Sequence, residues 1–162
     1  MKQIVTFLFL LPFTFSPIIK KTLQDFDRAG FYAAMKAGEM GQLDNEIALV
    51  QKSSFAQQKA FEGALLMRKS GLEKKASDKL KFFKEGRIKL ETAILNEPAN
   101  AEYRFLRLTI QENAPKQVKY KTNIDDDKKM IIKSYKNLLP AVQNAILDYS
   151  KNSDILKPGD FN

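Results

Sequence analysis

The chain has 162 residues, a formal net charge of +8 and a hydrophobic content of 44%, which is typical of one folded domain with a buried core. It has no cysteine and no histidine, so disulfides, thiol nucleophiles, thiolate metal sites and imidazole chemistry are excluded. Because the sequence also lacks a nucleophile elbow, a phosphate-binding loop and a metal-binding motif, we expect a protein without catalytic activity, cofactor or metal.

Residues 1–16 have the pattern of a secretory signal peptide. Lys2 provides a positively charged start, and residues 4–11 form an apolar stretch of suitable length. An uncleaved membrane anchor is one alternative, although residues 4–19 contain two prolines and are fewer than the roughly 20 residues that a spanning helix needs. An apolar N-terminus packed into the core of a soluble protein is another. We therefore expect export to the periplasm or cell envelope, with membrane anchoring as the alternative.

A helical hairpin is predicted after this segment. Across residues 22–37, apolar and small side chains recur at intervals of three and four, which is typical of a helix that another helix can approach closely. Gly38 and Gly41 indicate a tight turn. A shorter second helix follows, with three apolar positions on one side, namely Leu43, Ile47 and Val50.

A third helix is expected to begin near Ser54, because Ser54 and Gln57 have the spacing of a capping box. Ser70 and Gly71 indicate where it ends. Its apolar positions are Phe61, Ala64, Leu65 and Met67.

A long helix over residues 79–97 and a shorter helix that begins at Asn100 form the next hairpin. A proline ends the first helix, and the side-chain oxygen of Asn100 is suited to cap the second. The long helix has one main apolar stripe and two further apolar residues, Ile88 and Leu95, on another side, which predicts contacts with two neighbouring helices. The main stripe consists of Leu80, Phe83, Gly86, Leu90, Ala93 and Ile94, and the shorter helix has Tyr103, Leu106 and Ile110 on one face.

Part of this region resembles the tetratricopeptide repeat. Its second half is matched by a small residue, a large residue, an alanine and a proline at the family's spacing, namely Gly86, Leu90, Ala93 and Pro98. Its first helix is matched by Phe61, Ala64 and Leu65. The resemblance implies antiparallel hairpins stacked as a short array that binds other proteins. The match is irregular, since Phe61 and Gly86 are 25 residues apart where the repeat has about 16, and Arg68 replaces an aromatic residue. An irregular helix bundle is therefore the alternative.

Three polar residues of the helix that begins at Asn100 form a candidate ligand face. Arg104, Arg107 and Gln111 share one side, and a planar guanidinium group can hold a carboxylate of an acidic partner segment through two bonds. The alternative is that the arginines pair with nearby acids such as Glu97 or Glu102.

A second candidate is a lysine-rich patch that suits an anionic surface. Residues 68–89 carry nine cations and three acids, which favours anionic lipid or glycan as a partner. A solvated helix face is the alternative interpretation. The patch consists of Lys74, Lys75, Lys79, Lys81 and Lys84.

The last third of the chain begins with an unusual segment. Residues 116–124 alternate apolar and polar side chains, which predicts an extended connector that packs one side on the helices. The three acids of residues 125–127 are expected at a helix N-terminus, where they interact favourably with the helix dipole. Pro140 is suited to the first turn of a last helix, and residues 152–162 are expected to form a flexible tail.

We therefore predict an all-α protein with a signal peptide in residues 1–16, one helical domain in residues 17–151 and a flexible tail in residues 152–162. The predicted function is that of an exported helical-repeat scaffold whose partner is an unknown envelope protein. The alternative is an envelope-surface protein that binds anionic lipid or glycan through the lysine-rich helix. Nucleic acid is not an expected partner, because export separates the protein from genomic DNA.

Overall fold

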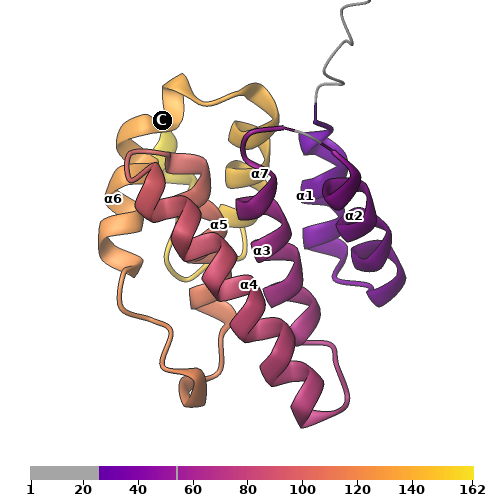
Figure 1. Cartoon of the computed structure of the whole chain (residues 1–162). Coiled ribbons are helices and arrows are strands. Elements are labelled where there is room, and N and C mark those ends of the chain that lie inside the picture. Colours follow the sequence, from indigo (N-terminus) through magenta and orange to yellow (C-terminus); the bar gives the residue numbers. More distant parts are fainter. Residues whose placement is uncertain (1–25, 54) are drawn as a thin grey trace, which may run out of the picture.

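The computed structural model describes residues 26–53 and 55–162 (Figure 1). These residues form seven α-helices and three short 3-10 turns and contain no strand, which confirms the predicted all-α class. The α-helices are α1 (Arg28–Ala37), α2 (Met40–Lys52), α3 (Gln58–Ser70), α4 (Ala76–Asn96), α5 (Ala101–Asn113), α6 (Ile124–Ser134) and α7 (Pro140–Ser150), and the 3-10 turns are η1 (Lys116–Val118), η2 (Tyr135–Asn137) and η3 (Pro158–Phe161). The predicted signal peptide and the capping residue Ser54 lie outside the described residues.

Helix α5 connects two hydrophobic cores. In Figure 1, α1 and α2 lie at one side of the molecule and α6 at the other, with α3, α4 and α5 between them. Tyr103, Leu106 and Ile110 of α5 belong to the first core, which α1 to α4 complete. Phe105 and Leu108 belong to the second core, which α6, α7 and the C-terminal segment complete. Because α5 is buried on both sides, it joins the two cores, and it packs directly on α3, α4 and α6.

Helices α3 and α4 pack through two glycines. A Cβ atom added to Gly63 would lie 2.7 Å from the carbonyl oxygen of Gly86, and one added to Gly86 would lie 2.5 Å from the carbonyl oxygen of Gly63. Only hydrogen fits at both positions, so the two backbones approach directly. This close contact also buries Leu90 completely, as the main stripe of this helix predicts.

The predicted helix starts and stops agree with the structure at several positions. Asn100 caps α5, because its side-chain oxygen accepts bonds from the backbone N–H groups of Glu102 and Tyr103. Gly38 follows α1 with a φ of 61°, a left-handed conformation that favours glycine. Pro140 occupies the first turn of α7. Local residue chemistry therefore sets these boundaries.

The second apolar stripe of α4 has no neighbouring helix among the described residues, so the prediction that it contacts one is wrong. Ile88 is 68% exposed and Leu95 is 79% exposed. Leu80, which the sequence places in the main stripe, is 52% exposed. The reason is that α4 packs with α3 and α5 on its inner side and extends beyond the end of α3.

The connector after α5 is not extended, contrary to the prediction from its alternating pattern. Residues 116–118 form the 3-10 turn η1, and Lys119 follows with a φ of 47°. Tyr120 is buried against the first core. The segment therefore forms a folded corner, and two of its alternating apolar residues, Val118 and Tyr120, pack on the first core, as the prediction of one packed side expects.

The C-terminal segment is docked on the domain, so the prediction of a flexible tail is wrong. Leu156 is fully buried and Phe161 is nearly so. The carboxylate of Glu112 accepts bonds from the Ser153 hydroxyl at 2.7 Å and from the Asp154 backbone N–H at 2.6 Å. One acid of α5 therefore holds the start of this segment, and two apolar side chains anchor the rest.

Candidate functional site

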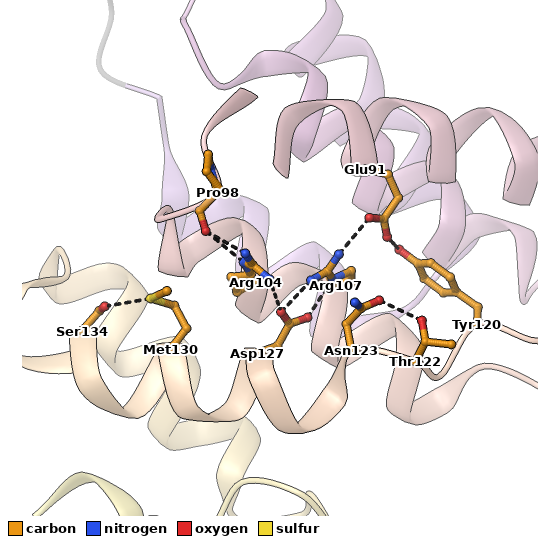
Figure 2. A network of polar contacts seen from close by, with 10 residues as sticks. All are labelled: Glu91, Pro98, Arg104, Arg107, Tyr120, Thr122, Asn123, Asp127, Met130 and Ser134. Atoms are coloured by element: carbon orange, nitrogen blue, oxygen red, sulfur yellow. Dashed lines mark hydrogen bonds and ion pairs between the residues drawn. The ribbon is translucent and has the colours of Figure 1, made fainter. Parts of the chain in front are cut away.

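Arg104 and Arg107 of the predicted ligand face lie in a polar network between α4, α5 and α6 (Figure 2), whereas the side chain of Gln111 has no hydrogen-bond partner among the described residues. Arg107 donates from Nε to Oδ2 of Asp127 and from Nη2 to Oδ1 of the same carboxylate, both at 2.7 Å. Arg104 donates from Nη1 to the same Oδ1 at 3.0 Å. Arg107 also donates from Nη1 to Glu91 at 2.8 Å. Two arginines of α5 therefore share one buried acid of α6.

Arg107 and Gln111 do not form an exposed surface. Arg107 is 3% exposed, and Gln111 and Asp127 are fully buried. Arg104 is partly buried and donates a further bond to the carbonyl of Pro98 at 2.8 Å. The arginines thus pair with acids of the same chain, as the alternative interpretation expects. The acids are Asp127 and Glu91, however, and not Glu97 or Glu102.

The electrostatics of this network keep Arg107 charged and Tyr120 neutral. Burial lowers the pKa of Arg107, but the bonds to Asp127 outweigh this effect and raise the pKa overall. The Tyr120 hydroxyl donates a hydrogen bond to Glu91. Burial is the main cause that raises the pKa of Tyr120, and this hydrogen bond raises it further. Glu91 therefore joins Arg107 to the connector as well as to α4. The arrangement stabilises a junction of three segments and presents no free nucleophile or base.

Asp127 is one of the three consecutive acids of α6. All three lie in the first turn, as predicted, but Asp125 and Asp126 are exposed whereas Asp127 points inward. No group of three metal-ligating side chains occurs among the described residues. In the part of the chain that the structure describes, these acids therefore lie at a helix N-terminus, and Asp127 also pairs with the two arginines of α5.

A second polar contact of α5 fixes α1. Arg28 donates from Nε to Glu102 at 3.1 Å, and Tyr32 donates its hydroxyl to the same carboxylate at 3.1 Å. Burial raises the pKa of Glu102, and the Arg28 guanidinium only partly opposes this. This contact orients α1 beside α5 and so places one wall of the cavity described next.

A groove of about 550 Å³ lies between α1 and α7, within the size range of ligand-binding pockets. Its floor comes from α5 and from the end of α3. Its lining is predominantly apolar, with a few polar groups at the edges. The groove is half-open. Residues that line it include Ala33, Met35, Met67, Leu106, Thr109, Asn113 and Ala145.

Small side chains form the two walls of the groove. Ala29 and Ala33 lie one turn apart on α1, and Ala141 and Ala145 lie one turn apart on α7. Alanine leaves the backbone accessible to a partner at short distance. The walls therefore suit an occupant with a regular backbone of its own, such as a helix.

Charged side chains form the rim of the groove. Lys36 of α1 and Asp148 of α7 make an ion pair of 2.7 Å, and its hydrogen bond lowers the pKa of Asp148. Arg68 of α3 donates from Nε to the carbonyl of Met35 at 3.0 Å and also lines the groove. The rim thus joins both walls at one point and carries an additional cation beside it.

The groove was not predicted from the sequence, because five helices (α1, α3, α4, α5 and α7) contribute to it. The nearest signal was the run of small residues in the first helix, which predicts close approach of another helix. The structure buries Ala34 in the core and leaves Ala33 exposed on the groove side. Helix α1 therefore has small residues on two sides, one that faces the hydrophobic core and one that faces the groove.

The predicted lysine-rich patch lies at the beginning of α4 and on its outer side. All five of its lysines are exposed. None of them makes an ion pair with another described residue, whereas Lys69 pairs with Asp44 of α2 and Lys89 pairs with Glu62 of α3. The patch is therefore a concentrated cationic surface.

None of the described helices is both long and apolar enough to cross a membrane. Comparison of the chain with protein-family models, curated proteins and solved structures finds no match. Function is therefore inferred from the geometry of the groove and of the lysine-rich surface.

Proposed function

We propose that this protein is an exported, non-catalytic helical scaffold that binds an amphipathic helix of a partner protein in the groove between α1 and α7. The observation that carries the proposal is the half-open apolar groove of about 550 Å³. A helix that lays its apolar face into such a groove is a recurrent mode of peptide recognition. Export follows the signal-peptide pattern of residues 1–16 and belongs to the same proposal.

The dimensions of the walls favour a helix as the occupant. The α1 wall extends from Ala29 to Lys36, which corresponds to about two helical turns or roughly 10 Å. A partner helix of this contact length would present apolar residues at positions i, i+3, i+4 and i+7. Met35 and Met67 also line the groove, and methionine adapts to irregular apolar surfaces.

The charge of the rim favours an acidic polar face on the partner helix. Lys36 and Arg68 supply two cations, whereas Asp148 already interacts with Lys36 and Lys151. The net charge of +8 adds attraction at longer range. Complementary charge of this kind increases association rate and specificity.

Selection of peptides on the whole chain would test the proposal. A displayed library of amphipathic helices with glutamate-rich polar faces is selected against the wild-type protein. Ala33→Phe fills the groove from an exposed position of α1, and Ala48→Phe adds the same ring at an exposed position of α2. The selected peptides should lose about tenfold or more in affinity for Ala33→Phe and bind Ala48→Phe as they bind the wild type.

Two results would contradict the proposal. One is a library that yields no binder, and the other is a set of binders that tolerate Ala33→Phe as well as Ala48→Phe. A synthetic peptide of residues 1–21 that binds the wild type and is rejected by Ala33→Phe would make the chain's own N-terminal segment the occupant. N-terminal sequencing of the native protein checks export, which an intact Met1 on soluble cytoplasmic material would contradict.

A further inference from the structure

Helix α4 presents an outer face on which two lysines are followed by two large aliphatic side chains. Lys81, Lys84, Ile88 and Leu95 are separated by three, four and seven residues, so they lie on one side of the helix. All four are exposed, and Leu95 has the highest exposure among the large hydrophobic side chains of the described residues. From Lys81 to Leu95 this face is about 21 Å long. It is therefore a linear surface with cations near one end and aliphatic groups near the other.

Three lysines place positive charge at the N-terminus of α4, where the helix dipole disfavours cations. Lys74, Lys75 and Lys79 surround the first turn, and the capping position Lys75 supplies no side-chain hydrogen bond to it. A helix N-terminus carries the positive end of the helix dipole, so cations there are unfavourable in the isolated protein. Asp78 is the acid in this first turn and offsets only part of the charge. An external anion at this end would relieve the repulsion.

We propose that the outer face of α4 docks on an anionic lipid membrane. Lys81 and Lys84 of the outer face, together with Lys74, Lys75 and Lys79 around the first turn, would contact headgroup phosphates. Ile88 and Leu95 would enter the boundary between headgroups and acyl chains. Cations and aliphatic groups on one helix face are the pattern of helices that lie in this interface. An anionic glycan would satisfy the lysines but offers no apolar layer for Ile88 and Leu95. The aliphatic side chains therefore favour a membrane over a glycan.

This surface is separate from the groove between α1 and α7. The residues of α4's outer face do not line the groove, to which α4 contributes Phe83 from its inner side. A scaffold with both surfaces would hold a partner helix close to a membrane. Membrane binding by α4 does not depend on whether the groove binds a helix.

The first experiment measures sedimentation of the full chain with vesicles. Mixed phosphatidylcholine–phosphatidylglycerol vesicles should bind the protein, and pure phosphatidylcholine vesicles should bind it much more weakly. Each lysine near an anionic surface contributes about fivefold to affinity, so replacing all five patch lysines with Gln should weaken binding by about 100-fold or more. The control variant replaces five other exposed lysines with Gln and has the same net charge; these are Lys52, Lys116, Lys129, Lys133 and Lys136.

The second experiment reports insertion directly. The chain has no tryptophan, so a single introduced tryptophan supplies the whole signal. Leu95→Trp should show a blue shift of its emission on mixed vesicles and none in buffer. Leu49→Trp, placed at a 62% exposed position of α2, should show no shift. Because both side chains are exposed, neither change is expected to disturb folding.

Specific outcomes overturn the proposal. Equal loss of vesicle binding in the patch and control variants would show that net charge alone acts. Vesicle binding that neither variant weakens would assign the membrane contact to residues 1–25. Retention on an anionic polysaccharide without a Leu95→Trp shift on vesicles would make the surface a glycan site. Failure of the wild type to bind anionic vesicles would leave the lysines as a solvated helix face.

Discussion

The two sides of α5 differ in both chemistry and access. The side that faces α6 is polar and closed, because Arg107 is enclosed by Asp127 and Glu91. The side that faces α1 and α7 has apolar residues in its floor and remains half-open. The sequence suggests the opposite assignment, since a row of arginines resembles a surface. The difference shows that a polar face becomes internal when a distant element brings the compensating charge.

Removal of the Asp127 carboxylate should produce the largest loss of stability. In Asp127→Ala, Arg107 stays buried without its carboxylate, and breaking a buried pair from one side costs about 3–5 kcal/mol. Denaturant titration followed by circular dichroism measures the loss. Asp126→Ala is the matched control, because Asp126 is exposed in the same turn and contributes about 1 kcal/mol or less.

A loss below about 1 kcal/mol in Asp127→Ala would mean that the polar side of α5 is not closed by this ion pair. The arginines would then have to be accessible in solution. That result would support the hypothesis that Arg104 and Arg107 form an exposed ligand face.

The closed side also depends on where α4 lies, because α4 supplies Glu91. Gly86→Ala adds a methyl group that would lie 2.5 Å from the backbone of α3, and overpacking of this kind costs about 1–3 kcal/mol. Gly41→Ala is the control, since a Cβ there meets no atom within 4 Å and the change should stabilise α2 by about 0.5–1 kcal/mol. Opposite signs for the two variants in thermal denaturation would confirm the direct contact of α3 with α4. A stabilising Gly86→Ala would show that the helices are further apart.

The wall of the open side depends on Glu112, which holds α7 and the C-terminal segment. Its carboxylate accepts bonds from the hydroxyls of Tyr149 and Ser153 at 2.7 Å. Burial raises the pKa of Glu112, but these bonds outweigh it and lower the pKa below its ordinary value of 4.5. Because the folded pKa is the lower one, the stabilisation is present above about pH 4.5 and is lost as the pH falls through the folded pKa.

Glu112→Gln should therefore cost about 1–2 kcal/mol at neutral pH, since the amide offers one accepting oxygen where the carboxylate offers two. The variant should also lose part of the acid-induced destabilisation below pH 4.5 that the wild type shows. Urea titrations at neutral and acidic pH measure both effects. Identical pH profiles for the two proteins would show that Glu112 does not hold this segment.

Features of the fold that follow from local chemistry could be predicted from the sequence. Asn100 caps α5, Pro140 begins α7 and Gly71 follows the last residue of α3, because each of these residues acts on its own neighbours. The buried positions of α2 were also predicted, since helical periodicity identifies a buried side when a helix is covered on one face. Helix α3 is buried on all sides from Ala60 to Met67, so its periodicity identified only part of its buried residues.

Features that depend on distant partners could not be predicted in this way. Asp127 lies 20 residues after Arg107, and nothing in the local pattern shows that it turns inward while Asp126 does not. The C-terminal segment has few apolar residues, and its Ile155, Leu156 and Phe161 show no period that would indicate burial. The groove was the hardest feature to predict, since its shape results from the angles between five helices.

The smallest expected effect concerns the ion pair at the rim of the open side. Lys36 and Asp148 are exposed, and exposed pairs contribute little to stability, so Lys36→Ala should leave the denaturation midpoint unchanged. Its effect should appear in binding, because Lys36 is one of two rim cations. Helical peptides selected on the groove should bind Lys36→Ala about two- to fivefold more weakly at low salt and equally at high salt, since salt screens exposed charges. Lys52→Ala is the control for net charge. Tighter binding to Lys36→Ala would mean that the ion pair restrains the groove and that the ligand must displace it, which would assign the rim a different role from the attraction of acidic helices.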